Sequence, residues 1–303
     1  MGKLITIKEA VSDVKKYVKG RMDGTITSWK TGYPKLNKKM LNGIEWNSTI
    51  TIGGRPSVGK STYSDDIIDG SFDLNLDSNG KPDFLLLDFN WELSTRVLLL
   101  RRLAAKLKMA YKDIISSETP ISEELFIKLC SILEDHYGEL PITFCEEPLS
   151  VQEFVKTVEE FCQANPGKKV VIRIDHTLLT KMTSSDNSQA QMLLNLLAAA
   201  NILKKKYPII FIFLTQLNRE FEDRQEDGTD NAFPRQGDVY GGDAAAMFSE
   251  TMILLNRPSK YGIRQYGRRG NGNSVLVEPD DIFAHMVKGR NSEADLILKY
   301  KEN

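Results

Sequence analysis

The sequence predicts a layered α/β fold with a mostly parallel central sheet. From about residue 30 onward, short apolar segments alternate with longer segments of helical periodicity, as in strands that are connected by helices. Two apolar segments, at 170–175 (VVIRID) and 209–215 (IIFIFLT), are almost continuous, which is typical of strands buried on both faces of a parallel sheet. A chain of 303 residues with 41% hydrophobic residues can bury such a core.

The first segment, residues 5–22, is predicted to form one short amphipathic helix. Thr6 and Glu9 fit a capping box at its start. Its apolar stripe consists of Val11, Val14, Tyr17 and Val18. Because so short a helix is marginal alone, this stripe should dock onto another surface. A polar linker follows, so we expect a linker helix and linker at 1–27 and one large domain at 28–303.

The large domain is expected to contain eight strands and five main helices. The strands are predicted at 49–52, 84–89, 142–144, 170–175, 209–215, 251–255, 282–288 and 295–300. The helices are predicted at 61–69, 94–106, 122–136, 151–164 and 189–205. The last two strands, joined through Gly289, should form an antiparallel hairpin at the edge of the sheet.

The charges of the chain are nearly balanced, with 40 Lys and Arg against 41 Asp and Glu. This balance excludes a uniformly basic surface, so any contact with a polyanion must come from a local group of residues. The three cysteines have neither disulfide nor metal-site spacing. No apolar run approaches the 18 residues of a membrane span, and the N-terminus lacks a secretion signal. We therefore expect a cytoplasmic protein without a membrane partner.

The strongest local motif is GRPSVGKS at residues 54–61, which matches G-x-x-x-x-G-K-[ST]. It follows a predicted strand and opens a predicted helix, so its backbone N–H groups should wrap the phosphates of a nucleotide. Lys60 would bridge the β- and γ-phosphates, and Ser61 would bind Mg²⁺. The nucleotide-binding residues are expected to be Gly54, Arg55, Pro56, Ser57, Val58, Gly59, Lys60, Ser61 and Thr62.

A phosphate loop of this kind also needs carboxylates. Asp175 ends the predicted strand 170–175, where a parallel strand delivers its last residue to a ligand, and is the expected metal carboxylate. Glu92, just past the strand 84–89, is the candidate that orients the attacking water, and Asp88 inside that strand is the alternative. Gln216, after the strand 209–215, is the candidate sensor of the γ-phosphate.

Taken in order, GGRPSVGKST, FNWEL, VVIRIDHTLL, FLTQLNR and Lys288-Gly-Arg290 resemble the ATPase domain of DnaB-type replicative helicases. The approach to the phosphate loop, TGYPKLNKKMLNGI, also looks like that family, and the resemblance covers about residues 28–303. It implies a RecA-like core, a hexameric ring, ATP sites between subunits, and single-stranded DNA in the central channel with 5′ to 3′ movement.

The resemblance also assigns roles to residues. It places Lys60 and Ser61 on the phosphates and Mg²⁺, and it makes Glu92 the catalytic carboxylate. It gives Asp175 to Mg²⁺ and makes Gln216 a sensor. It further implies that Lys288 and Arg290 act on the γ-phosphate of the neighbouring subunit.

Two features depart from the family pattern. Replicative members carry a helical domain ahead of the linker helix, whereas about 25 residues precede the core here. We therefore expect a compact form of the kind that phages and mobile elements encode, to which primase binding through that helical domain does not carry over. A helicase loader or a primase is still a candidate partner from the family. In addition, Tyr240 and Gly241 stand where the family has an Arg and a Glu, so the DNA contact of that Arg does not carry over.

Contacts to DNA must then come from other residues. The Gly-rich stretch 236–242 is the main candidate, because its backbone N–H groups are expected to be free and Tyr240 could stack on a base. The polar loops 181–189 and 217–237 are further candidates. The segment 257–269 mixes basic and aromatic residues and is either a third contact or a solvated hairpin. The predicted DNA-contacting residues are Lys181, Arg219, Arg235, Tyr240, Gly241 and Gly242.

Three functions fit these observations. The first is an ATP-driven hexameric DNA helicase of replication that uses ATP and Mg²⁺. The second is a RecA- or RadA-like ATPase of recombination or repair. The third is a helicase-like subunit that changes shape with nucleotide and does not unwind DNA. The presence of Lys60, Glu92, Asp175 and Arg290 favours an active ATPase.

Overall fold

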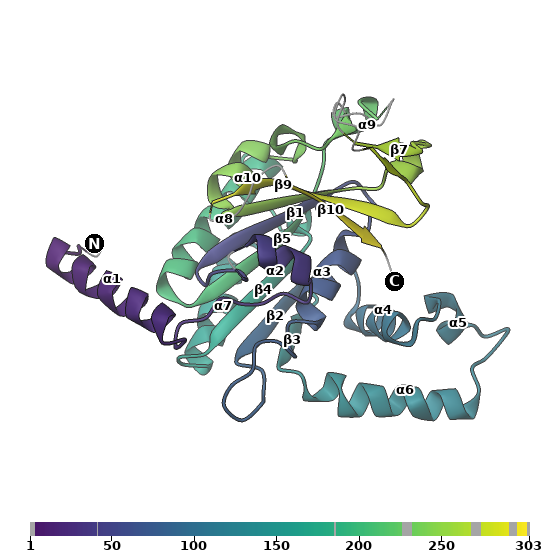
Figure 1. Ribbon diagram of the computed structural model, residues 1–303, viewed down its shortest axis with the longest axis horizontal. Helices are drawn as coiled ribbons and strands as arrows, with labels where there is room; N and C mark the ends of the chain where they lie inside the picture. The colour runs from purple at the N-terminus through teal and green to yellow at the C-terminus, as the bar shows by residue number, and fades with distance from the viewer. Residues whose placement is uncertain are drawn as a thin grey trace.

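The computed structural model describes residues 4–40, 42–184, 186–225, 232–267, 274–290 and 296–301. Within these residues, one large sheet contains the strands β1 (Ser48–Gly54), β2 (Phe84–Asn90), β3 (Ile142–Cys145), β4 (Lys169–Asp175), β5 (Ile209–Gln216), β6 (Thr251–Asn256), β9 (Asp281–Gly289) and β10 (Leu296–Lys301). The order across this sheet is β10-β9-β6-β1-β5-β4-β2-β3 (Figure 1). The predicted α/β fold and its eight main strands are confirmed.

Six neighbouring strands of the sheet, from β6 to β3, run parallel. β9 runs antiparallel to β6, and β10 runs antiparallel to β9. The predicted antiparallel hairpin at the edge is therefore confirmed. Gly289 does not form its turn, because it still pairs with Thr251 of β6.

Helices cover both faces of the sheet. The helices α2 (Pro34–Lys39) and α3 (Lys60–Asp69) pack on one face, and α7 (Val151–Ala164), α8 (Gln189–Lys206) and α10 (Gly242–Phe248) pack on the other. Alternate residues of β5 divide between the two faces: Ile210, Ile212 and Leu214 enter one core, and Ile209, Phe211 and Phe213 enter the other. This two-sided burial explains why the strand is apolar at every position.

Three helices form a small unit of their own beside the sheet. They are α4 (Thr95–Leu107), α5 (Tyr111–Ile115) and α6 (Glu123–Asp135), and they lie on the right of Figure 1. Leu103, Ile114 and Leu129 are the centre of their separate apolar cluster. The helices predicted at 94–106 and 122–136 are thereby confirmed. The unit is joined to the sheet at both ends, because α4 follows β2 and residues 136–141 lead from α6 to β3.

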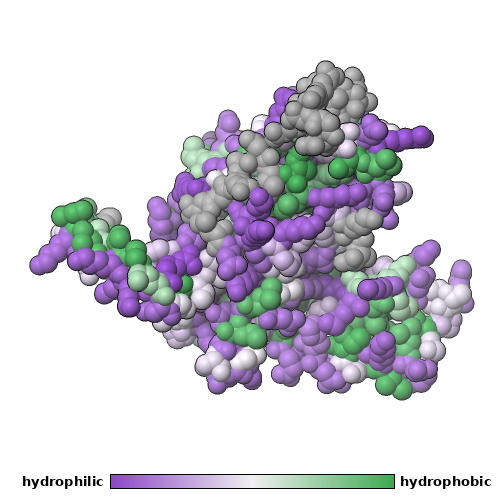
Figure 2. Space-filling model, viewed as in Figure 1, coloured by the Kyte–Doolittle hydropathy of each residue, from purple (hydrophilic) through white to green (hydrophobic). Residues whose placement is uncertain are grey.

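The N-terminal helix α1 (Ile7–Met22) extends away from the sheet (Figure 1). Its predicted capping box is confirmed, since Thr6 and Glu9 bond to each other's backbone N–H groups. Its C-terminal part is attached to the domain by an ion pair of 2.6 Å between Arg21 and Glu45. The apolar stripe remains exposed, with Val14 at 59%, and Figure 2 shows apolar side chains along this helix. Within this chain, then, the stripe has not docked.

Shorter elements connect the main ones. They are η1 (Tyr137–Glu139), η2 (Thr177–Leu179), α9 (Glu220–Asp223), η4 (Gln236–Asp238), η5 (Pro258–Tyr261), β7 (Gln265–Tyr266) and β8 (Val275–Leu276). β7 and β8 pair antiparallel, so the described end of the basic and aromatic segment pairs as a hairpin, while its contact with nucleic acid stays a prediction. Tyr266 is buried there and its hydroxyl lies 2.9 Å from Nε2 of His285. Arg268 and Arg269 lie outside the described residues.

No helix in the described ranges is long and apolar enough to span a membrane.

Candidate nucleotide site

The loop between β1 and α3 has the shape that its sequence pattern requires. Gly59 adopts φ +96°, a left-handed conformation that favours glycine, directly before the first residue of α3. Gly54 lies close to Val58, and a Cβ atom added to Gly54 would be 2.5 Å from Cγ1 of Val58. Both glycines of the pattern are therefore needed for the loop to fold back on itself.

Lys60 lies inside this loop. Its Nζ donates hydrogen bonds to the carbonyl oxygens of Gly54 (3.0 Å) and Arg55 (3.2 Å). Burial lowers the pKa of the ammonium group. These two carbonyls hold the cation at the centre of the loop.

Ser61 and Asp175 meet across the gap between α3 and β4. The Ser61 hydroxyl donates a hydrogen bond of 2.7 Å to Oδ2 of Asp175. Asp175 is 1% exposed at the carboxyl end of β4, and burial raises its pKa to about 6, although Arg173 nearby opposes this shift. Its other oxygen, Oδ1, is buried without a hydrogen-bond partner.

These two side chains fit a magnesium ion. Mg²⁺ prefers oxygen ligands, and in nucleotide sites it takes one or two from the protein and the rest from phosphates and water. A hydroxyl and a carboxylate with an unpartnered buried oxygen supply such ligands. No group of three or more metal-binding side chains occurs elsewhere in the described ranges. Ser61 and Asp175 are thus the residues that would hold Mg²⁺.

The two candidate carboxylates, one inside β2 and one just past it, lie in different environments. Asp88 is completely buried, and both of its oxygens accept hydrogen bonds from Arg173, at 2.9 and 2.6 Å. Glu92 lies beyond the end of the strand with its side chain 53% exposed. It faces the end of β4, where its Oε2 is 3.8 Å from Nε2 of His176. Glu92, unlike Asp88, is available to a water molecule at the site.

His176 joins Glu92 and Gln216, and it was missed by the sequence reasoning. The amide nitrogen of Gln216 is 3.5 Å from Nε2 of His176. Burial lowers the pKa of this imidazole. The available signal was its position directly after Asp175 at the end of a buried strand. The structure therefore brings Lys60, Ser61, Asp175, Glu92 and Gln216 to one edge of the sheet.

Lys288 and Arg290 lie at the opposite end of the sheet. Gly54 pairs with Leu255 near the end of β6, whereas Gly289 pairs with Thr251 at its start. Arg290 contacts Glu250 at 3.2 Å, and Nζ of Lys288 donates a hydrogen bond to the carbonyl of Ala246. Lys288 pairs with Met252, which lies opposite Thr51, and Arg290 bonds to Glu250, which bonds to Thr49. Measured along β1 at about 3.3 Å per residue, Lys288 is therefore about 10 Å and Arg290 about 16 Å from Gly54 of their own phosphate loop.

The Gly-rich stretch 236–242 folds differently from the expectation. The backbone N–H groups of Asp238, Val239 and Tyr240 all donate hydrogen bonds, the last to the carbonyl of Gln216 (3.0 Å). The expectation of free N–H groups is wrong at these three positions, because the segment forms η4 and leads into α10. Gly241 adopts φ +65° as the N-cap of α10, which begins at Gly242.

The predicted DNA-contacting side chains are accessible to different degrees. Tyr240 is half-buried, and its hydroxyl donates a hydrogen bond of 3.1 Å to the side chain of Gln189 on α8. Lys181, Arg219 and Arg235 are exposed. Part of the loop 217–237 is ordered by α9, which buries Phe221. Tyr240 is therefore the candidate that is connected directly to Gln216.

A cavity of about 270 Å³ opens beside the phosphate loop. Nζ of Lys260 donates a hydrogen bond to the carbonyl of Ser57, and Arg55 forms an ion pair of 2.9 Å with Glu222. Tyr261 also lines this cavity. Lys260 and Tyr261 belong to the segment 257–269, which the sequence linked to DNA and not to the phosphate loop.

A phosphate loop between the first strand and its helix, facing a hydroxyl–carboxylate pair within a mostly parallel sheet, defines a P-loop nucleotide-binding domain of the RecA-like class. The chain matches the family model for the DnaB-like helicase C-terminal domain over residues 28–299. It belongs to this family, and the predicted resemblance is confirmed.

Curated relatives include replicative DNA helicases DnaB. That of Buchnera aphidicola subsp. Schizaphis graminum is 23% identical over 223 residues, which are 73% of this chain and 45% of the relative. That of Leifsonia xyli subsp. xyli is 22% identical over 256 residues, which are 84% of this chain and 52% of the relative. The chain thus spans about half the length of the curated relatives it matches.

Solved structures show the same fold. One solved ATPase domain superposes with a TM-score of 0.78 at 18% identity, covering 98% of this chain and 95% of that chain. A DnaB-like replicative helicase, described with its interactions with primase, superposes with a TM-score of 0.75 at 18% identity, covering 98% of this chain and 64% of that chain. The RecA-like architecture predicted from the resemblance is confirmed.

Proposed function

We propose that this chain is the motor of a replicative DNA helicase, which hydrolyses ATP with Mg²⁺ as a hexameric ring and moves 5′ to 3′ along single-stranded DNA. The contact between Ser61 and Asp175, beside Lys60 and Glu92, is the observation that carries the proposal. Together these four residues supply a phosphate-binding cation, two metal ligands and an accessible carboxylate. Family membership adds the DNA substrate and the setting in replication.

The residues of the site have separate tasks in hydrolysis. Lys60 exchanges the carbonyls of Gly54 and Arg55 for oxygens of the β- and γ-phosphates. Ser61 and Asp175 hold Mg²⁺, which when bound neutralises negative charge on the phosphates. Glu92 orients the attacking water. Because phosphoryl transfer depends on positioning and on charge stabilisation, these tasks account for catalysis.

Gln216 connects hydrolysis to DNA. Its side chain lies beside His176, and its backbone carbonyl accepts the hydrogen bond from Tyr240. A shift of Gln216 when the γ-phosphate leaves would therefore move Tyr240 and the following glycines, Gly241 and Gly242. We place single-stranded DNA against this segment, with Lys181, Arg219 and Arg235 as supporting phosphate contacts.

Lys288 and Arg290 serve the site of a neighbouring copy. Along the strand direction Lys288 lies about 10 Å and Arg290 about 16 Å from their own phosphate loop, and both side chains are held by contacts at the far end of the sheet, so we assign neither to its own nucleotide. An interface that joins the loop edge of one copy to the opposite edge of the next is heterologous, and such an interface closes into a ring when the rotation between copies closes. Because Lys288 and Arg290 are assigned to a neighbour's site, the partner that we propose first is a second copy of this chain. A helicase loader or a primase is a further partner that we propose from the family.

Strand displacement on forked DNA tests the proposal. Forks with a 5′ tail and with a 3′ tail are compared, alongside ATPase activity with and without single-stranded DNA. We expect displacement from the 5′ tail alone and ATPase activity that DNA stimulates, with Lys60→Ala inactive in both assays. DNA-stimulated ATPase without displacement on either fork would contradict the helicase function and would favour a non-unwinding subunit or a recombination ATPase.

A further inference from the structure

Five charged side chains form a cluster with a buried centre next to the nucleotide site, and none of them belongs to the phosphate-loop pattern. They are Asp65 and Asp69 of α3, Asp88 of β2, Arg102 of α4 and Arg173 of β4. Asp88 and Arg173 are completely buried, and Arg102 is 3% exposed. We refer to these five residues as the ion network.

Arg173 connects β4 to two other elements. Its Nε and Nη2 donate to the two oxygens of Asp88 on β2, at 2.9 and 2.6 Å. Its Nη1 donates to the hydroxyl of Ser64 on α3, at 3.0 Å, and to Asp65. One planar guanidinium group therefore fixes the spacing of β2, β4 and α3 at this point, as the rigid fork of arginine allows.

This connection lies directly beside the proposed metal ligands. Arg173 and Asp175 are two residues apart on β4, so both side chains face α3. α3 contacts them in the same order, because Ser61 bonds to Asp175 while Ser64 bonds to Arg173. The helix that carries the phosphate-loop lysine is thus attached to β4 at two successive points.

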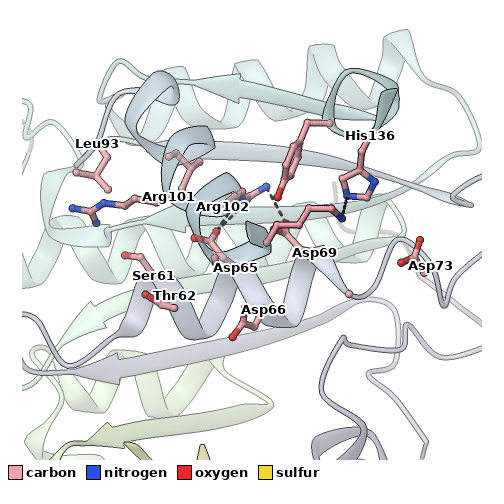
Figure 3. Close-up of a pocket in the computed structure, with 15 residues that line it drawn as sticks. Ser61, Thr62, Asp65, Asp66, Asp69, Asp73, Leu93, Arg101, Arg102 and His136 are labelled. Atoms are coloured by element: carbon pink, nitrogen blue, oxygen red, sulfur yellow. Dashed lines mark hydrogen bonds and ion pairs between the residues drawn. The ribbon is translucent and has the colours of Figure 1, made fainter. Parts of the chain in front are cut away.

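Arg102 connects a fourth element, α4, to the ion network. Its Nη2 donates to Asp65 at 2.8 Å, and its Nη1 is 3.0 Å from Asp69 (Figure 3). α4, which carries Arg102, begins three residues after Glu92. A cavity of about 290 Å³ is lined by these groups and also by Ser61 and so extends from the ion network to the nucleotide site.

Stability alone does not account for the ion network. Replacing a buried ion pair by apolar side chains is often neutral or stabilising, because both charges lose their hydration. Leu86 and Val171, which precede Asp88 and Arg173 by two residues on the same face of the sheet, are part of the apolar core, so apolar side chains are compatible with this part of the face. Ion pairs, unlike apolar contacts, fix the direction and the distance between the two elements that they join.

We propose that Arg173 and Arg102 are positioning residues of the ATPase, which hold the elements carrying Lys60, Asp175 and Glu92 at the spacing that hydrolysis requires. The inference rests on the proposed function. A displacement of about 1 Å at a reacting group can cost about 100-fold in rate. Removal of the ion network should therefore lower turnover while nucleotide binding by the loop backbone persists.

The test is a pair of double variants. Asp88→Val with Arg173→Met removes both charges of the most buried pair. The control, Asp83→Val with Lys169→Met, removes an ion pair of 2.8 Å between the residue that precedes β2 and the first residue of β4, at the other end of these strands. That end is about 20 Å from Asp175, at the rise of a β-strand. Thermal midpoint, affinity for a fluorescent ATP analogue, kcat and the Mg²⁺ concentration for half-maximal activity are measured for both.

For the first double variant we expect a thermal midpoint close to wild type and nucleotide affinity within about 3-fold, but kcat about 10- to 100-fold lower. We also expect a higher Mg²⁺ requirement. The control variant should keep wild-type kcat. Wild-type kcat in a folded Asp88→Val, Arg173→Met protein would overturn the inference, as would an equal loss in the control.

Arg173→Lys covers the case in which the first double variant does not fold. It keeps the positive charge but loses the two-pronged contact to Asp88, so we expect a folded protein with reduced kcat. Wild-type kcat in Arg173→Lys would then refute the positioning role. A wild-type protein that hydrolyses no ATP would instead overturn the proposed function itself, which separates the two failures.

Discussion

Two inactive variants should restore each other's ATPase activity when they are mixed. Arg290→Ala leaves the phosphate loop intact, and Lys60→Ala leaves the arginine intact. Because the two residues lie at opposite ends of the sheet, a ring interface takes Lys60 from one chain and Arg290 from the next. Arg290 is mostly exposed and its pair with Glu250 is a surface contact, so the substitution should cost little stability.

The size of the recovery follows from counting interfaces. In an equal and random mixture, about one interface in four joins an intact Lys60 to an intact Arg290, if the ring is heterologous. Independent interfaces would then give about a quarter of the wild-type rate. Each variant alone should be nearly inactive, since an arginine acting in trans contributes about 10³- to 10⁵-fold to the rate.

The assay is steady-state ATP hydrolysis at a fixed total protein concentration, across a series of mixing ratios. Native mass spectrometry of the same samples establishes that mixed assemblies form. Recovery should be greatest near equal amounts and absent at both ends of the series. An inactive mixture in the presence of mixed assemblies would refute the action of Arg290 in trans, and so would wild-type hydrolysis by a monomeric fraction.

Four further results are expected. Lys60→Ala should abolish hydrolysis, because backbone N–H groups alone do not neutralise the charge that develops on the γ-phosphate; a rate within a few-fold of wild type would contradict the phosphate-loop assignment. Glu92→Gln should bind nucleotide but turn over slowly, and if Asp88→Asn alone shows this behaviour our choice of carboxylate is wrong. Deletion of residues 1–22 should shift the protein towards monomers, because it removes an exposed apolar helix face; an unchanged mass by light scattering would mean that this face does not hold the assembly. Tyr240→Ala should weaken binding of single-stranded DNA by about 1–3 kcal/mol if the ring stacks on a base, whereas Tyr240→Phe should not; fluorescence anisotropy that is unaffected by the alanine would place Tyr240 in a packing role.

The main strands and the phosphate loop were predictable because their signals are local. A strand buried on both faces must be apolar throughout, so 209–215 could be assigned without knowledge of its neighbours. Likewise, the glycines at 54 and 59 are needed for the loop's own backbone. The position of Asp175 followed from the rule that parallel strands deliver their last residues to one edge.

The ion network was not predictable because it depends on long-range pairing. A charged residue inside an apolar strand, Arg173, signals a buried partner, but the sequence does not say which of many acidic residues supplies it. Asp88 was considered a candidate for catalysis for the same reason, since its pairing with Arg173 depends on β2 and β4 being neighbours. The burial of Tyr266 was equally hard to foresee, because the sequence does not show that an aromatic residue in a basic stretch packs inside the hairpin.

The separation of the phosphate loop from Arg290 also links ATP to assembly. If each complete site is shared by two chains, a nucleotide bound between them stabilises the associated state over the separated one. Bound ATP would then stabilise the contact between chains, and its hydrolysis would weaken that contact. The ATPase activity per chain would fall on dilution, because separated chains have no complete site. A closed ring would have as many complete sites as chains, whereas an opened ring would lose the site at its gap. Opening one interface to load such a ring onto DNA would therefore inactivate one ATPase site and leave the other sites intact.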